Sequence, residues 1–279
     1  MAILRRYYWL FILLLGAGCN KNLDYIGLFY TETGVNQRCR ESMAWNLTHA
    51  REITVRDSVY KMVFTGDPHI GGTANLKKAM KAAADSGAVC FVVAGDITTG
   101  RQDDYATTAA LLNADLPYEV ALTTGNHDLF FGGWRWYYHY FGSSVYSLKV
   151  HHNSATDLFV FLDTGSGTLG TLQYEWLKNE LLSRNKYRNV VVLTHLNFIR
   201  NLMTSTTNPP VQEINALLDL FARNRIALVI MAHDHARYTE RFGNTTYITL
   251  DALVDYGTNA SYLLVIGGTG GLNYKFVDL

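Results

Sequence analysis

The chain has 279 residues, and its 24 Lys plus Arg balance its 24 Asp plus Glu, so the formal net charge is zero. Hydrophobic residues make up 48% and charged residues 17%, a composition that excludes collagen-like proteins, disordered proteins and proteins with charged tails. Without a basic excess, specific nucleic-acid binding is not expected, and any affinity for phosphate must come from a local site. The three cysteines, Cys19, Cys39 and Cys90, are too few for a disulfide scaffold and form no CxxC pair.

The N-terminus predicts export. Arg5 and Arg6 precede an apolar run from Tyr7 to Leu15, which is too short to span a membrane. The following Gly16-Ala17-Gly18-Cys19 resembles a bacterial lipoprotein cleavage box, although such boxes usually carry a bulky aliphatic residue where Gly16 stands. We therefore expect residues 1–18 to be a signal peptide, and Cys19 to be lipidated and anchored to a bacterial membrane on its periplasmic or cell-surface side. Ordinary secretion and an uncleaved anchor are the alternatives.

Residues 19–58 are polar and irregular, and we interpret them as a tether and an N-terminal cap with a strand at Tyr25–Tyr30 and a short helix at Glu41–Ala50. From residue 59 to 279, short apolar runs alternate with amphipathic stretches, which predicts βαβ units in one domain. The predicted strands are Tyr60–Thr65, Val89–Ala94, Tyr118–Thr123, Leu158–Leu162, Val190–Thr194 and Ala227–Met231. Tyr247–Leu250, Tyr262–Ile266 and Tyr274–Val277 follow without intervening helices, which indicates antiparallel strands.

Helices are predicted between the strands. Thr73 is placed to cap a segment that stops at Gly87, and Asp103 to cap Tyr105–Leu112. Two further helices are indicated by apolar stripes at helical spacing. Those stripes are Leu172, Trp176, Leu177 and Leu181, and then Val211, Ile214, Leu218 and Phe221.

Polar side chains gather where five of the predicted strands end. They are Asp67, His69, Asp96, Asn126, His127, Asp128, His195, His233 and His235. Because the carboxyl ends of strands in an open α/β sheet form one crevice, we expect these residues, spread over about 170 positions, to converge there. Taken alone, each has a plainer interpretation as a turn residue, a helix cap or a hydrogen-bonded core histidine, and we keep that interpretation for His49, His139, His151 and His152.

The residue types at the strand ends predict a metal centre. Imidazoles and carboxylates without thiolates suit Mn, Fe or Zn. Asp67 and His69 are two residues apart, as are His233 and His235, so on extended backbone each pair would point to one side. The set exceeds what one tetrahedral ion needs, which favours two ions. The candidate ligands are Asp67, His69, Asp96, Asn126, His195, His233 and His235.

The order of these motifs resembles the calcineurin-like metallophosphoesterase superfamily, with its DxH, GDxx, GNHD/E, lone His and GHxH motifs. They stand here as Asp67-Pro68-His69, Gly95-Asp96, Gly125-Asn126-His127-Asp128, His195 and Ala232-His233-Asp234-His235. The resemblance implies a four-layer α/β/β/α sandwich of two mixed sheets flanked by helices. It also implies hydrolysis of phosphate mono- or diesters by a bridging hydroxide between two divalent ions.

The resemblance also assigns a role to each position. One ion would be held by Asp67, His69, Asp96 and His235, and the other by Asp96, Asn126, His195 and His233, with Asp96 bridging. His127 and Asp128 would be catalytic, His127 contacting the phosphoryl group and Asp128 orienting His127 by a hydrogen bond.

Three departures from the superfamily pattern stand out. Ala232 replaces a glycine, and Asn197 stands where many members have proline. Thr99 occupies the position of the tyrosine that binds iron in purple acid phosphatases, which argues against a ferric-tyrosinate site.

Arg101, Phe131 and Trp134 are candidates for substrate binding, the two aromatics because they flank Gly132-Gly133. The plainer interpretations are a solvated arginine and aromatics that pack a helix onto the sheet. For the whole protein, the alternative to an enzyme is a non-catalytic, metal-binding or scaffolding lipoprotein that keeps the fold.

Overall fold

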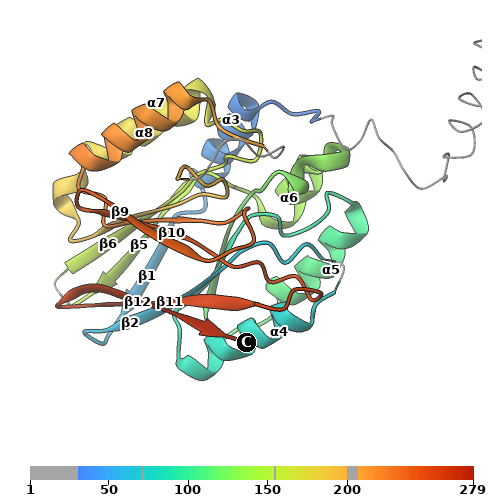
Figure 1. Ribbon diagram of the computed structural model, residues 1–279, viewed down its shortest axis with the longest axis horizontal. Coiled ribbons are helices and arrows are strands. Elements are labelled where there is room, and N and C mark those ends of the chain that lie inside the picture. Colours follow the sequence, from blue (N-terminus) through green and yellow to red (C-terminus); the bar gives the residue numbers. More distant parts are fainter. Residues whose placement is uncertain (1–30, 71, 154, 200–206) are drawn as a thin grey trace, which may run out of the picture.

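The computed structural model describes residues 31–70, 72–153, 155–199 and 207–279 (Figure 1). The predicted signal peptide, Cys19 and the predicted strand at Tyr25–Tyr30 lie outside the described residues. Within the described part of the chain, every helix is too short or too polar to cross a membrane.

Two mixed β-sheets face each other at the centre of the molecule (Figure 1). The smaller sheet has the order β12-β11-β2-β3-β4, and the larger has the order β1-β5-β6-β7-β8-β10-β9. The smaller sheet consists of β2 (Tyr60–Thr65), β3 (Cys90–Ala94), β4 (Glu119–Thr123), β11 (Ser261–Gly268) and β12 (Gly271–Asp278). The larger consists of β1 (Arg51–Val55), β5 (Tyr146–His152), β6 (Ala155–Phe161), β7 (Val190–Leu193), β8 (Leu228–Met231), β9 (Tyr238–Phe242) and β10 (Thr245–Thr249).

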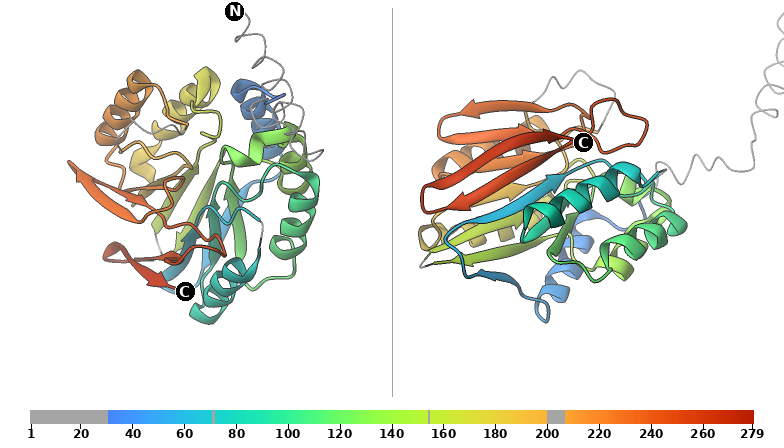
Figure 2. Two further views of the ribbon diagram at one scale, coloured as in Figure 1. Left: turned by 45° about the vertical axis from the view of Figure 1, so that its right-hand side comes forward. Right: turned by 90° about the horizontal axis from the view of Figure 1, so that it is seen from below.

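Helices cover the outer face of each sheet (Figure 2). The smaller sheet is covered by α4 (Ala74–Ser86), α5 (Gln102–Leu112) and α6 (Trp134–Phe141), and the larger by α7 (Gly170–Leu181) and α8 (Val211–Arg223). Two short 3-10 helices, His127–Gly132 and Arg184–Lys186, complete the helices between the strands. One apolar core fills the space between the sheets and one lies under each helical layer. The predicted four-layer α/β/β/α sandwich is therefore confirmed.

The apolar runs predict the central strands well, because those strands are buried on both faces. The bounds of β2 are those predicted, and β3, β4, β7 and β8 differ by one residue at one end. The antiparallel prediction holds for β11 and β12, but β10 is parallel to β8, with Tyr247 opposite Val229, and antiparallel only to β9. β1, β5 and β9 were not predicted, since their exposed or half-exposed positions break the apolar run.

The N-terminal region contributes α3 (Val35–Asn46) and the edge strand β1 to the same fold. The helix begins and ends earlier than the predicted Glu41–Ala50. It is held by Arg38, whose fully buried guanidinium donates to the Asp163 carboxylate at 2.7 and 3.0 Å. Because Asp163 follows β6, α3 is anchored in the interior and is more than a peripheral cap.

The predicted helix caps are wrong in detail. Thr73 precedes α4, but its side chain makes no capping hydrogen bond with the described residues. The Asp255 carboxylate instead accepts from the backbone N–H groups of Ala74 and Asn75, at 2.9 and 2.8 Å. Asp103 lies inside the first turn of α5, and Arg101 occupies the cap position. A residue far along the chain has thus replaced the local cap of α4.

Candidate metal centre

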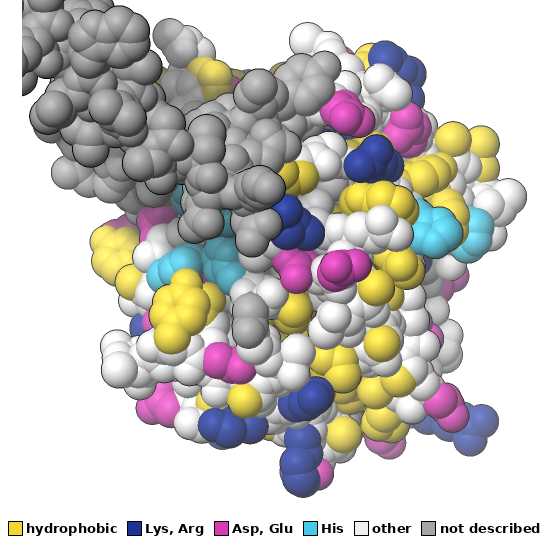
Figure 3. All heavy atoms as spheres, turned by 90° about the vertical axis from the view of Figure 1, so that its right-hand side faces the viewer, with side chains coloured by type: hydrophobic (Ala, Val, Ile, Leu, Met, Phe, Trp, Pro, Cys, Tyr) yellow, Lys and Arg dark blue, Asp and Glu magenta, His cyan; other side chains and the backbone are white. Residues whose placement is uncertain are grey.

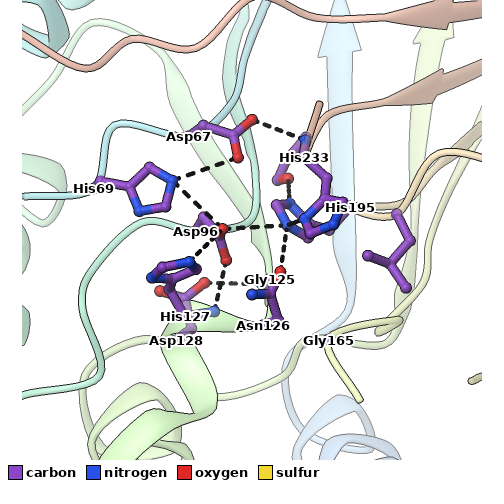
Figure 4. Close-up of polar contacts among 12 residues, drawn as sticks. Asp67, His69, Asp96, Gly125, Asn126, His127, Asp128, Gly165, His195 and His233 are labelled. Carbon is purple, nitrogen blue, oxygen red and sulfur yellow. Dashed lines mark hydrogen bonds and ion pairs between the residues drawn. The ribbon is translucent and has the colours of Figure 1, made fainter. Parts of the chain in front are cut away.

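The candidate ligands meet where the carboxyl ends of both sheets come together, rather than in the crevice of one open sheet. Asp67, Asp96 and Asn126 follow β2, β3 and β4 of the smaller sheet, whereas His195, His233 and His235 follow β7 and β8 of the larger. Figure 4 shows Asp96 in the middle of this arrangement, with histidines from both sheets around it. All seven predicted ligands are thus brought together.

Most of the ligands have a left-handed backbone, not the extended one that we predicted. Of the eight described non-glycine residues with positive φ, five are candidate ligands. They are Asp67 (52°), His69 (40°), Asp96 (48°), His233 (74°) and His235 (55°). Such conformations cost free energy for residues with a Cβ and cluster at functional sites. In both motifs, Asp67 with His69 and His233 with His235, the two ligands are therefore carried by a tight turn. The turn directs their side chains back over the strand ends.

One group of ligand atoms is formed by Asp67, His69 and His235. Asp67 Oδ1 lies 3.7 Å from Nε2 of His69 and 3.4 Å from Nε2 of His235. The two ring nitrogens are 3.1 Å apart. The ligand atoms of the three residues all lie within 4.8 Å of one another, which is close enough to hold one ion.

A second group is formed by Asp96, His195 and His233, with Asn126 beside it. Nε2 of His195 lies 3.4 Å from Asp96 Oδ2, 3.1 Å from Nδ1 of His233 and 3.2 Å from Oδ1 of Asn126. The ring of His195 is fully buried, and its Nδ1 contacts the carbonyl oxygen of Ala94 at 2.8 Å. A histidine ligand usually donates its second nitrogen in this way, which fixes the ring and the tautomer.

Asp96 joins the two groups. Its Oδ2 lies 3.4 Å from His195 and 3.5 Å from His69, and therefore faces both sets of ligands (Figure 4). Its Oδ1 accepts a hydrogen bond from the backbone N–H of His127 at 2.8 Å. The His127 ring also faces this carboxylate, with Nε2 3.9 Å from Oδ2, and forms a third cluster with His69 and Asp96.

The electrostatics of the site favour cations. Burial opposes ionisation of the Asp67 carboxyl, but His235 and His69 outweigh it and hold the pKa of Asp67 well below its usual range. The pKa of Asp96 is also lowered, because His195 outweighs burial. In return, Asp96 overcomes the effect of burial on His195 and raises the pKa of that imidazole to about 9. The two carboxylates thus remain ionised although both are buried.

The described residues fit a metal. Asp67 Oδ1 is buried and has no hydrogen-bond partner among them, an expensive arrangement for a carboxylate oxygen unless a cation faces it. The donors are imidazoles, carboxylates and an amide oxygen, a set that suits Mn, Fe or Zn. Nε2 of His195 and Nδ1 of His233 are 3.1 Å apart, close enough to bind one ion.

Asp128 does not hydrogen-bond to His127, in contrast to the prediction. Its buried carboxylate accepts from the backbone N–H groups of Ile97, Thr98 and Gly125, at 3.2, 2.8 and 2.9 Å, and from the Thr98 hydroxyl. Burial, with the nearby charge of Asp96, raises the pKa of Asp128 to about 7. Asp128 therefore ties the loop after β3 to the loop after β4, and so positions the backbone that carries Asp96 and Asn126.

The predicted substrate residues separate into two kinds. Trp134 is only 3% exposed, donates its indole N–H to Glu41 and stacks on Tyr137, so it packs in the interior and does not support the predicted role in substrate binding. Arg101 is exposed and stacks on the half-buried Phe131, with its guanidinium carbon 4.1 Å from the ring centroid.

Phe130 was missed by the sequence analysis. Its ring centroid lies 4.6 Å from that of His127. The neighbouring His69 ring meets His127 edge-on at 4.5 Å, so the His127 ring contacts both. The aromatic run after the third motif pointed to this segment, but the sequence offered no means of choosing which ring faces the site.

Comparisons with known proteins agree with this geometry. A model of the calcineurin-like phosphoesterase family matches residues 60–237, while no curated protein matches the chain. Among solved structures, GAP50, the anchor in the inner membrane complex of Plasmodium, is 12% identical with a TM-score of 0.63, covering 80% of this chain and 85% of that one. A dimetal phosphatase from Danio rerio is 15% identical with a TM-score of 0.57, covering 80% and 99%. At these identities the structures support the fold, and because the family model covers more than half of the residues, the chain belongs to the calcineurin-like phosphoesterase family.

Proposed function

We propose that the protein hydrolyses phosphate esters at a centre of two divalent first-row ions, Mn, Fe or Zn. The observation that carries this proposal is the convergence of seven ligands into two groups that share Asp96. Asp67, His69, Asp96 and His235 would hold one ion, and Asp96, Asn126, His195 and His233 the other. Membership of a phosphoesterase family and the candidate ligand clusters support this assignment.

When bound, such ions lower the pKa of coordinated water and neutralise charge that develops on phosphate oxygens. The protein's own residues would bind and orient the substrate and donate hydrogen bonds to it. His127 would contact the phosphoryl group, a role supported by its side chain, which faces Asp96 yet is 39% exposed. Burial lowers the pKa of His127 below the usual imidazole value, although Asp96 opposes this shift. A ring N–H of His127 can donate a hydrogen bond to a phosphate or leaving-group oxygen.

Arg101 and Phe131 are proposed to contact the part of the substrate that is not transferred. Gly100 packs against the carbonyl oxygens of His127 and Phe130, so Arg101 follows a residue that touches the loop of His127. Histidine side chains reach the surface beside hydrophobic ones on the face shown in Figure 3. The Phe131 ring and the Arg101 guanidinium, stacked on each other, would suit a substrate that has both an apolar and an anionic part.

The main alternative is a metal-binding scaffold without turnover. The fold alone cannot reject it, because one of the similar structures is described as an anchor. The proposal of an enzyme instead depends on the partly exposed His127, which a purely metal-binding site does not need.

We also propose that Cys19 carries a lipid that anchors the protein to a bacterial membrane after export. The basis is the run of residues 5–19. Glu32 lies against Gly132, beside the loop of His127. The 13 steps from Cys19 to Glu32 span at most about 45 Å when extended, and a lipid on Cys19 would therefore keep the site near the membrane surface. Incorporation of labelled palmitate by wild type, and its loss in Cys19→Ser, tests this proposal.

Activity is tested with the full chain purified in detergent, loaded separately with Mn, Fe or Zn, on nitrophenyl phosphate mono- and diesters. We expect release of nitrophenolate with at least one ion, and a loss of at least tenfold in Asn126→Ala and His127→Ala. His139→Ala is the matched control, because His139 is exposed on α6 and outside the ligand groups. A wild-type protein that binds two ions but cleaves neither substrate class would favour the scaffold.

A further inference from the structure

The loops after β7 and β8 are joined by the side chain of Asn197. This residue is 2% exposed and lies two positions after His195. Its amide Nδ2 donates to Oδ2 of Asp234 at 2.9 Å and to the hydroxyl of Thr249 at 3.0 Å. Its Oδ1 accepts from the backbone N–H of Ile199 at 2.7 Å. One side chain therefore connects the loop of His195, the loop of His233 and the end of β10.

Asparagine suits this position for a chemical reason. The carbonyl of Asn197 makes an Asx turn with Ile199, which bends the chain just after His195. Its two amide hydrogens remain for two acceptors on other segments. An aspartate could make the turn but would have no donor for Asp234, and proline, common at this position in the family, could make neither contact.

The hydrogen bond from Asn197 to Asp234 matters for the metal centre, because Asp234 lies between two candidate ligands, His233 and His235. His233 faces His195 across 3.1 Å, whereas His235 faces Asp67 and His69. The two loops also share a backbone hydrogen bond from the N–H of Ala232 to the carbonyl of His195, at 2.9 Å. Ala232 precedes His233, and Asp234 follows it. The hydrogen bond from Asn197 to Asp234 is therefore a second link between the two loops, on the other side of His233 in the sequence.

We propose that Asn197 is a positioning residue that sets the separation of His195 and His233, and thereby the affinity for the ion held by Asp96, Asn126, His195 and His233. The proposal rests on the two-ion centre proposed above. Loss of a residue that orients metal ligands typically weakens affinity by about 10–100-fold. The other ion should be affected less. Its ligand His235 follows Asp234, but Asp67 and His69 come from the loop after β2, which Asn197 does not contact in the described structure.

The test is Mn²⁺ binding to the full chain. Calorimetry measures the affinities, and electron paramagnetic resonance detects the signal of a coupled ion pair. Asn197→Asp keeps the shape and the turn but places a carboxylate against Asp234. We expect the Mn²⁺ affinity of the second ion, the one held by Asp96, Asn126, His195 and His233, to fall at least tenfold. The coupled signal should be replaced by that of a single ion, and the affinity for the other ion should change less than threefold.

The reversed pair, Asn197→Asp with Asp234→Asn, restores an amide–carboxylate hydrogen bond in the opposite direction, and we expect it to recover most of the second affinity. Asn113→Asp is the matched control, because Asn113 is exposed and donates to Tyr140 far from the ligands. Thermal unfolding in chelator establishes that each variant folds. If Asn197→Asp does not fold, Asn197→Ala replaces it, with the same expected loss of the second ion.

Two results would overturn the assignment of Asn197. One is an unchanged second affinity in a folded variant, and the other is an equal loss of both ions. A wild-type chain that binds only one ion would instead overturn the two-ion centre, and the role of Asn197 with it. The wild-type titration thus separates failure of the proposed function from failure of this inference.

Discussion

Gly66 and Ala232 face each other where the two sheets meet, and a methyl group on Gly66 would lie 2.7 Å from the methyl carbon of Ala232. Each residue directly precedes a candidate ligand, Asp67 or His233. The close approach lets Oδ2 of Asp67 accept the backbone N–H of His233 at 3.0 Å. The methyl group of Ala232, which departs from the family pattern, is thus accommodated by a glycine on the opposite strand end.

Gly66→Ala should therefore destabilise the protein by about 1–3 kcal/mol, the usual cost of overpacking. Urea unfolding measures the change. Gly66→Ala combined with Ala232→Gly moves the methyl group to the other side and should recover most of the loss. If the double variant is as unstable as Gly66→Ala alone, the contact between the two methyl positions is not the cause.

Arg38→Met should lower the free energy of unfolding by about 3–5 kcal/mol, because it leaves the buried Asp163 carboxylate without its partner. Arg40→Met, two residues along the same helix at an exposed position, is the control and should change stability by less than about 0.5 kcal/mol. Chemical denaturation of both variants gives the comparison. Equal effects would contradict the view that α3 is anchored through this ion pair.

Asp255→Ala should cost about 1 kcal/mol, within the range found for loss of a helix N-cap. The carboxylate of Asp255 caps α4, which begins five residues after His69. Thr73→Ala should be nearly neutral, although Thr73 is the residue that the sequence suggests as the cap. Thermal unfolding of the two variants decides between the local and the distant cap.

Divalent ions should stabilise the fold. At an ion concentration 100-fold above the dissociation constant, one site adds about 2.7 kcal/mol to the free energy of unfolding. Asp96→Asn keeps the hydrogen bond from His127 but removes the charge shared by both groups, so most of this gain should be lost. Melting curves with Mn²⁺ and with chelator measure it, and a full Mn²⁺ shift in Asp96→Asn would contradict a shared ligand.

The sequence predicts the parts of the fold that depend on local pattern. Tyr60–Thr65 is recognised as a strand because both of its faces are covered, so it is apolar almost throughout. β5 alternates buried and half-buried residues, with Lys149 and His151 facing outward, and β9 is mostly exposed, so neither forms an apolar run. The candidate ligands at the strand ends could also be predicted, because the order of the strands brings residues such as Asp67 and His195 together.

Contacts between distant segments could not be predicted. Arg38 and Asp163 are 125 residues apart, and Asp255 caps a helix that begins some 180 residues earlier. Neither pair leaves a local pattern. The orientation of Asp128 was also beyond the sequence, since the choice between His127 and the N–H groups of Ile97 and Thr98 depends on how two loops pack.

The left-handed backbone at five candidate ligands has a consequence for how this chain could change by mutation. Glycine at any of these positions would remove a steric penalty of about 1–2 kcal/mol, but each such substitution would also remove a candidate ligand. The chain carries Asp or His at all five. At these five positions the chain therefore gives up some stability and keeps side chains that are candidate metal ligands.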